Sequence, residues 1–169
     1  ILELMLEYGL AKGVEGTDVA LHAREEAIVK RRAADGSLLS NNPNHRKKGL
    51  ISDALFFNLI GFDELKSVDI DSFEGADYLF DMNTEGIGAV IGEPVDMVID
   101  VGTLEHIFHL PNVFRNIFEA LAVGGHVMHF SPANNHLDHG FYQFSPTLFN
   151  DYYRANNYDV LEIMIYRHT

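Results

Sequence analysis

The sequence lacks cysteine, and this absence excludes several classes of protein. Without thiols the chain can hold no disulfide scaffold and no cysteine-ligated zinc, and it offers no thiol nucleophile. No apolar run approaches the ~20 residues that a membrane-spanning helix needs. No basic-then-apolar segment typical of a signal peptide opens the chain. We therefore expect a cytoplasmic protein with no membrane partner.

Basic residues are also scarce. The 169 residues include 12 Lys or Arg and 25 Asp or Glu, so the formal net charge is −13. Because nucleic-acid phosphates and anionic membranes attract Lys and Arg, this balance argues against a nucleic-acid partner. Apolar residues make up 47% and charged residues 22%, which is typical of a globular chain with a single core.

The few basic residues are concentrated near the start of the chain. Residues 1–48 hold eight Lys or Arg and seven Asp or Glu, whereas residues 49–169 hold four and eighteen. The change falls at the polar stretch 40–48, which we expect to be an exposed loop. The sequence thus predicts an N-terminal extension or lid over residues 1–48 and an acidic α/β domain over residues 49–169.

Short apolar segments alternate with helical patterns after residue 60. Capping residues and apolar spacing predict helices that begin at Thr17 or Asp18, Asp53, Pro111 and Ser145. The apolar segments predict strands over residues 65–70, 78–81, 95–100, 126–130 and 159–167. Gly124 and Gly125 are expected to end the helix before the fourth strand. Such alternation indicates a mostly parallel sheet with crossover helices. Only about eight residues join the first two strands, so that connection has room for one helical turn at most.

Acidic and small polar residues follow three of the predicted strands. In open parallel sheets, ligands bind outside the carboxyl ends of the strands. A carboxylate there can accept both hydroxyls of a ribose, and the scarcity of Lys and Arg suits free phosphates poorly. The pattern favours a neutral or cationic ligand that carries a nucleoside; the alternative is that these side chains only cap turns. The residues are Asp69 and Asp71, Asp81 with Met82 and Asn83, and Asp100 with Gly102 and Thr103.

Longer motifs resemble a known family. The stretch VDMVIDVGTLEHIF, an amphipathic helix and LAVGGHVMHFSP resemble strands four and five of class I S-adenosylmethionine-dependent methyltransferases. FEGADYLFDMN, GTLEH and SPANNHLDHGFYQFSPTLF resemble, more narrowly, a largely uncharacterised bacterial subgroup of these enzymes. The similarity covers roughly residues 52–160. It implies a Rossmann-like three-layer α/β/α sandwich with a mostly parallel sheet.

The resemblance implies S-adenosylmethionine as the cofactor and a small-molecule methyl acceptor. Asp69 matches the acidic residue that holds the cofactor ribose in the family. The other matching positions, on the adenine side and beside the methionine part, are Asp81, Met82, Asp100, Gly102 and Thr103.

Three residues are candidates for the base that takes a proton from the acceptor. Glu105 and His106 match the turn next to the transferable methyl group, and His139 follows in a polar loop over residues 134–143. The implied chemistry is in-line attack by an acceptor nitrogen, oxygen or carbon on the sulfonium methyl. Such catalysis depends mainly on positioning of the two reactants. The loop is either on the substrate side or a set of tight turns.

The sequence departs from the family at both ends. The family's Gly-rich loop after strand one has no match between Lys48 and Leu65, and the nearest candidate strand lies at residues 1–9. In the family another strand follows the one that matches residues 159–167 and forms an antiparallel pair, so we expect a truncated C-terminal hairpin in a chain that ends at Thr169. We therefore expect a degenerate first strand, and the alternative function is a catalytically inactive methyltransferase-like binding domain. An unfinished sheet edge favours pairing with a second copy, as a homodimer.

Six of the nine histidines lie between residues 106 and 139. A metal site built from His106-x-x-His109, or from His136-x-Asp138-His139 with Glu105, would indicate a metal-dependent hydrolase. We favour histidines that hydrogen-bond loops around a substrate pocket, with no resident metal. His126 and His129 are three apart on a strand and therefore point to opposite faces.

Overall fold

The computed structural model describes residues 18–167, so the candidate first strand at residues 1–9 lies outside the described residues. The chain divides into two compact units, Ile1–Leu79 and Phe80–Thr169. The expected boundary after residue 48 stays a prediction. Among residues 18–167, every helix falls short of the length and apolar character that crossing a bilayer requires.

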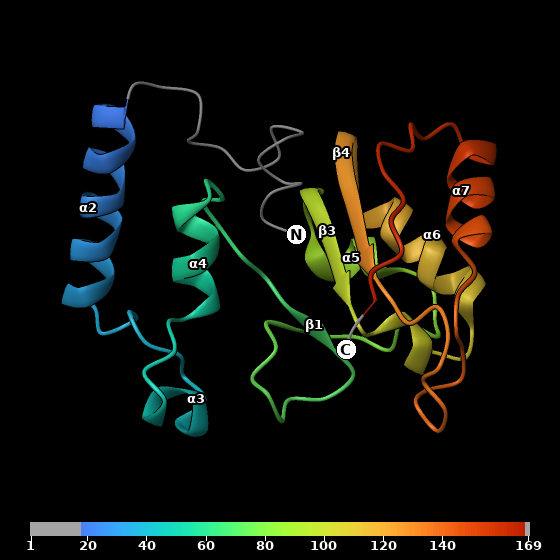
Figure 1. The fold of residues 1–169 in the computed structure, drawn as a ribbon, viewed down its shortest axis with the longest axis horizontal. Helices are drawn as coiled ribbons and strands as arrows, with labels where there is room; N and C mark the ends of the chain where they lie inside the picture. The colour runs from blue at the N-terminus through green and yellow to red at the C-terminus, as the bar shows by residue number, and fades with distance from the viewer. Residues whose placement is uncertain (1–17, 168–169) are drawn as a thin grey trace. The chain divides into compact units, whose positions relative to one another are not determined.

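The first unit contains the helices α2 (Asp18–Ala34), α3 (Pro43–Lys47) and α4 (Asp53–Leu59) (Figure 1). The predictions of α2 and α4 are confirmed, and Ser52 Oγ accepts a hydrogen bond from Leu55 N at 3.1 Å. Arg32 Nε donates to Asn58 Oδ1 at 3.1 Å and thereby joins α2 to α4. Helix α3 lies within the expected loop, because the Asn42 side chain and a proline in the first turn cap it.

Two short strands complete the first unit. β1 (Val68–Asp69) pairs in parallel with β2 (Tyr78–Leu79). The described connection over residues 70–77 contains no helix, as its length predicted. Both strands are shorter than expected. On the β1 side, the Asp69 and Asp71 side chains accept backbone N–H groups two residues ahead and turn the chain out of the ladder.

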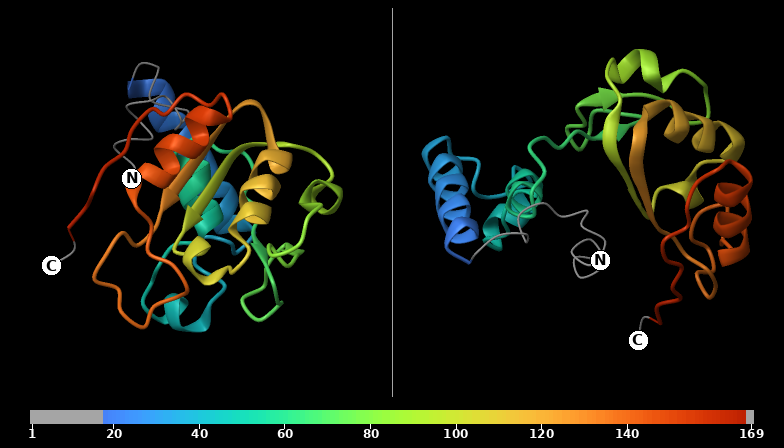
Figure 2. Two further views of the ribbon diagram at one scale, coloured as in Figure 1. Left: turned by 90° about the vertical axis from the view of Figure 1, so that its right-hand side faces the viewer. Right: turned by 90° about the horizontal axis from the view of Figure 1, so that it is seen from above.

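The second unit is built around a longer parallel pair, β3 (Val95–Val101) and β4 (Leu121–Phe130). The other elements are α5 (Ile87–Ile91), the 3₁₀ turn η1 (Leu104–His106), α6 (Leu110–Ala120) and α7 (Pro146–Ala155). Helix α6 connects the two strands, and both views show α6 and α7 on the same face of the pair (Figures 1 and 2). The expected crossover from strand to helix to parallel strand is therefore present here.

The core of this unit lies between the strand pair and the two helices. Val113, Phe114 and Ile117 recur at helical spacing on α6 and are buried, whereas Phe118 on the same helix is exposed. They pack with Leu104, Phe144 and Tyr153, and partly buried Val98 and Val127 join them from the strands. Burial of each large apolar side chain contributes about 1.5–3 kcal/mol, so this cluster is the main stabilising element of the unit.

The expectation of one continuous sheet with a last strand over residues 159–167 is not met. The described residues form two separate two-stranded parallel sheets, and residues 159–167 have no regular structure. An apolar pattern alone does not specify a strand, because a strand also requires the pairing of its backbone groups with a neighbour. The fold is mixed α/β with small parallel sheets, and the three-layer sandwich remains a proposal.

The Gly124–Gly125 pair has another role than the expected one. Helix α6 ends at Ala120, and the glycines lie inside β4, where the register breaks between the pairs Val95–Leu121 and Met97–His126. Gly124 has φ +81°, and a Cβ at Gly125 would lie 2.9 Å from Ala122 O. The glycines therefore permit an irregular start of the strand.

Candidate functional site

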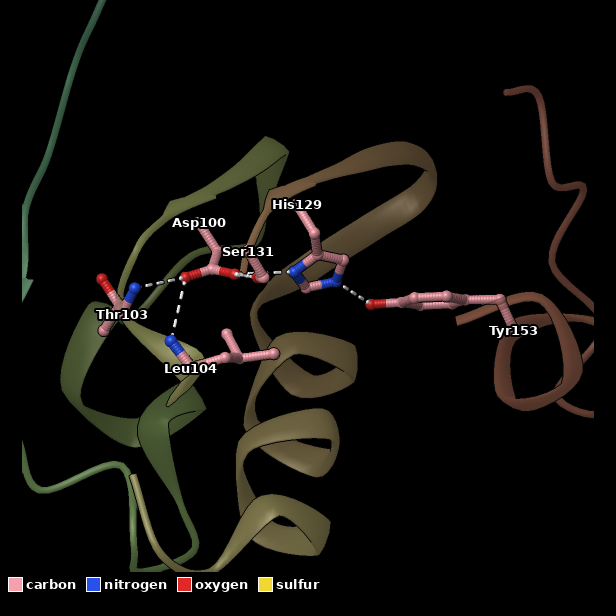
Figure 3. A network of polar contacts seen from close by, with 6 residues as sticks. All are labelled: Asp100, Thr103, Leu104, His129, Ser131 and Tyr153. Carbon is pink, nitrogen blue, oxygen red and sulfur yellow. Dashed lines mark hydrogen bonds and ion pairs between the residues drawn. The ribbon is translucent and has the colours of Figure 1, made fainter. Parts of the chain in front are cut away.

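A buried hydrogen-bond network centres on Asp100, near the carboxyl end of β3 (Figure 3). Its Oδ1 accepts from Thr103 N at 3.1 Å and from Leu104 N at 3.2 Å. Its Oδ2 lies 2.9 Å from His129 Nδ1 and 3.3 Å from Ser131 Oγ. Both carboxylate oxygens are therefore occupied, and Asp100 holds the turn after β3 together.

His129 extends this network to helix α7. Its Nε2 lies 2.6 Å from the Tyr153 hydroxyl. Because Nδ1 faces a carboxylate, we assign the proton to Nδ1, and Nε2 then accepts from the Tyr153 O–H. Burial raises the pKa of the Tyr153 phenol well above its ordinary value, which keeps this group a donor. The chain Asp100–His129–Tyr153 thus ties β3, β4 and α7 together (Figure 3).

The turn after β3 places Glu105 and His106 beside the strand ends. Gly102 has φ +73°, a conformation that favours glycine, and its N donates to Phe130 O at 2.9 Å. Gly102 and Thr103 are exposed at this edge. The next two residues, Leu104 and Glu105, are both buried. The sequence from Gly102 to His106 therefore forms a tight turn, in which Gly102 and Thr103 are exposed and the Glu105 carboxylate is buried.

The three predicted catalytic residues lie together. Glu105 Oε1 lies 3.4 Å from His139 Nε2 and 3.9 Å from His106 Nε2. The two imidazoles are half exposed and meet edge to face at 4.8 Å between ring centres. The Glu105 side chain is only 1% exposed, and its Oε2 has no hydrogen-bond partner in the part of the chain that the structure describes.

The loop that carries His139 is attached to the backbone of Glu105. Phe141 N donates to Glu105 O at 2.6 Å, and Tyr142 N approaches the same oxygen at 3.3 Å. Gly140 has φ +71°, and a Cβ there would lie 2.6 Å from Glu105 O. Only glycine fits this close approach, so Gly140 lets the polar loop bring His139 next to Glu105.

The segment after β2 is anchored by side chains that the sequence analysis missed. Asn116 is fully buried on α6 and donates from Nδ2 to Thr84 O at 2.7 Å. Asn112 Nδ2 donates to Asn83 O at 2.5 Å. Asn112 and Asn116 interrupt the otherwise apolar face of this helix, and this pattern in the sequence could have predicted their role. They hold the loop that contains Asp81 and Met82 against α6.

Asp81 and Asp69 each cap their own turn. Asp81 Oδ1 accepts from both the backbone N and the side-chain Nδ2 of Asn83 at 2.8 Å, and these bonds lower the pKa of Asp81 below its ordinary value. Asp69 Oδ1 accepts from Asp71 N at 3.2 Å. Asp69 belongs to the first unit and the other predicted site residues belong to the second, so its role in one shared site stays a prediction.

Two other sequence expectations concern the histidines. His109 precedes α6 as its N-cap residue and lies outside the group formed by Glu105, His106 and His139. The ring of His136 lies 5.3 Å from that of His139. A shallow hollow between α6 and α7, lined in part by Arg115, contains none of the predicted site residues.

Comparison of the chain with protein-family models, with curated proteins and with solved structures yielded no match. The family resemblance therefore depends on the sequence motifs quoted above.

Proposed function

We propose that this protein is an S-adenosylmethionine-dependent methyltransferase that acts on a small molecule. The observation that carries the proposal is the turn after β3, where Asp100 closes the backbone, Gly102 is exposed, and Glu105 and His106 follow at once. This turn lies at the carboxyl end of a parallel strand pair, where ligands bind in open α/β sheets.

The carboxylates at the strand ends fit the cofactor. Among the described residues, the hydrogen bonds that Asp81 makes within its turn use Oδ1, which leaves Oδ2 to accept from an adenine amino group. The family resemblance assigns the ribose to Asp69, whose hydrogen bond with Asp71 N also uses Oδ1. Both carboxylate oxygens of Asp100 already accept hydrogen bonds from protein groups. Asp100 would therefore not contact the cofactor, but would position the exposed Gly102 and Thr103 that do. When bound, S-adenosylmethionine supplies an electrophilic methyl group on sulfonium sulfur.

The cluster of Glu105, His106 and His139 supplies proton chemistry for the acceptor. An exposed imidazole can accept the proton that an acceptor hydroxyl or amine releases during attack. Phe108 and Phe141 are both exposed and meet edge to face at 5.7 Å between ring centres, in the two segments that carry this cluster. This arrangement fits an acceptor with an aromatic or apolar part.

Calorimetry with S-adenosylhomocysteine on the full chain, in the presence of EDTA, tests the cofactor assignment. We expect saturable binding in the wild type and a loss of affinity of tenfold or more in Asp69→Ala. The matched control is Asp96→Ala, because Asp96 is an exposed carboxylate at the opposite end of β3. A ligand at 100 times its dissociation constant adds about 2.7 kcal/mol to stability, so a thermal shift gives a second measurement.

Two outcomes would contradict this proposal. Absence of binding at roughly 1 mM ligand would remove the cofactor assignment. Equal affinity of Asp69→Ala and wild type would remove the role of Asp69. Binding without methyl transfer to any of a panel of aromatic hydroxyl and amine acceptors would favour the inactive binding domain.

A further inference from the structure

The carboxylate of Glu105 is an unusual group in this fold. It is almost completely buried, yet Oε2 has no hydrogen-bond partner among the described residues, and Oε1 has only imidazole nitrogens beside it. A buried carboxylate without donors is costly, and such groups in native proteins generally pair with a cation. Among the described residues, Glu105 forms ion pairs with the two histidines and with neither Lys nor Arg.

The distances between the possible ligand atoms at this carboxylate are close to those between the ligands of a bound metal. Glu105 Oε1, a ring nitrogen of His106 and one of His139 all lie within 4.8 Å of one another. Zinc with bonds of about 2.0–2.1 Å places tetrahedral ligand atoms about 3.4 Å apart. The separation of Glu105 Oε1 from His139 Nε2 is 3.4 Å, and the separation from His106 Nε2 is longer, at 3.9 Å; the His106 side chain is half exposed.

We propose that Glu105, His106 and His139 bind a divalent transition metal, with zinc as the best match. Two imidazoles and one carboxylate suit Zn²⁺, Co²⁺ or Ni²⁺, whereas Mg²⁺ and Ca²⁺ require mainly oxygen ligands. Three protein ligands leave a further coordination position for water or for an oxygen of a bound molecule. The assignment does not depend on the cofactor proposed above. Ring nitrogens bound to a metal cannot accept a proton, so the base role given above to His106 and His139 applies to the metal-free protein, and a metal-bound water would be the proton acceptor when the site is loaded.

The surrounding backbone supports this assignment. The carbonyl of Glu105 accepts from Phe141 N, so the residue that supplies the carboxylate also anchors the loop that supplies His139. A Cβ at Gly102 would lie 3.5 Å from Glu105 Oε1, an ordinary contact distance, so the exposed Gly102 rim lies directly beside this oxygen. Hydrogen bonds from neighbouring groups that orient the ligand residues are typical of metal sites.

Calorimetric titration of the EDTA-treated and desalted full chain with Zn²⁺ tests the proposal. We expect one ion per chain, and a Co²⁺ titration should give visible absorption bands from the same site. Glu105→Gln and His139→Gln should each weaken Zn²⁺ binding by tenfold or more. His109→Gln removes a nearby exposed histidine outside the cluster and should leave the affinity unchanged.

Circular dichroism of each variant would show whether it is folded, and only folded variants enter the comparison. Absence of Zn²⁺ binding by the wild type at roughly 1 mM would overturn the proposal. Binding of equal affinity in Glu105→Gln and His139→Gln would overturn it as well, because the ion would then lie elsewhere. Binding of S-adenosylhomocysteine in EDTA is a separate measurement, so failure of either proposal is recognisable by itself.

Discussion

His129 faces Asp100 directly across the parallel strands β3 and β4. The two residues are register partners, and His129 Nδ1 lies 2.9 Å from Asp100 Oδ2. Both side chains are nearly buried. The pair joins the end of one strand to the end of the next, and it lies next to the turn that presents Glu105.

Removal of the Asp100 carboxylate should destabilise the second unit. Asp100→Ala deprives two backbone N–H groups, an imidazole and a serine hydroxyl of their acceptor. We expect the free energy of unfolding to fall by about 3 kcal/mol, measured by urea denaturation. Asp96→Ala, an exposed change on the same strand, should stay within about 0.5 kcal/mol of the wild type. Equal stability of the two variants would contradict the role of the network.

Tyr153→Phe should change how stability depends on alkaline pH. Burial raises the pKa of Tyr153 above 10.0, so above that pH the unfolded chain loses a proton that the folded chain retains. This contribution is fully present below pH 10 and is lost as the pH rises, and the variant should show a shallower decline between roughly pH 10 and 11. At pH 7 the lost hydrogen bond to His129 should cost about 1 kcal/mol. Urea unfolding at several pH values measures both effects, and Tyr166→Phe, an exposed change, should alter neither.

Asn116→Ala should loosen the loop that contains Asp81 and Met82. The substitution removes a buried amide that donates to Thr84 O at 2.7 Å and accepts from the N–H of buried Ile87 at 3.4 Å. We expect a loss of about 2 kcal/mol in the free energy of unfolding. Arg115→Ala is the control, because this exposed neighbour on α6 reaches the same loop only through a surface ion pair with Glu85. A loss of equal size in the control would contradict the role of the buried amide.

Gly140→Ala should separate His139 from Glu105. The new Cβ would lie 2.6 Å from Glu105 O, and the residue would also have to adopt a positive φ. We expect a loss of more than about 2 kcal/mol in stability and a weaker Zn²⁺ titration. Gly124→Ala also has a positive φ but meets no atom within 4 Å, so it should cost only about 1 kcal/mol and leave Zn²⁺ binding unchanged. Identical behaviour of the two variants would show that the close contact is unimportant.

Glu105→Gln should not destabilise the metal-free protein. The substitution removes a buried negative charge whose Oε2 has no partner in the described chain, and the amide has the same shape. In EDTA we expect the variant to be as stable as the wild type or more stable by about 1 kcal/mol, measured by thermal denaturation. A loss of more than 2 kcal/mol in EDTA would indicate that the carboxylate has a structural partner instead.

Local signals in the sequence predicted the helices α2, α4, α6 and α7, but neither α3 nor α5. Ser52 and Ser145 cap α4 and α7, and a proline lies in the first turn of α6, as predicted. The apolar run of β3 and the turn residues after it were also recognisable. These features act within one helical turn or one strand, so neighbouring residues suffice to specify them.

Only the tertiary structure decided which distant residues meet. His139 reaches Glu105 because Gly140 allows the loop to touch the Glu105 carbonyl, and Tyr153 reaches His129 because α7 packs on the strand pair. Residues 159–167 have the apolar pattern of a strand, and yet no strand is formed there among the described residues. Pairing across long separations depends on the path of the loops, and no local pattern in the sequence encodes that path.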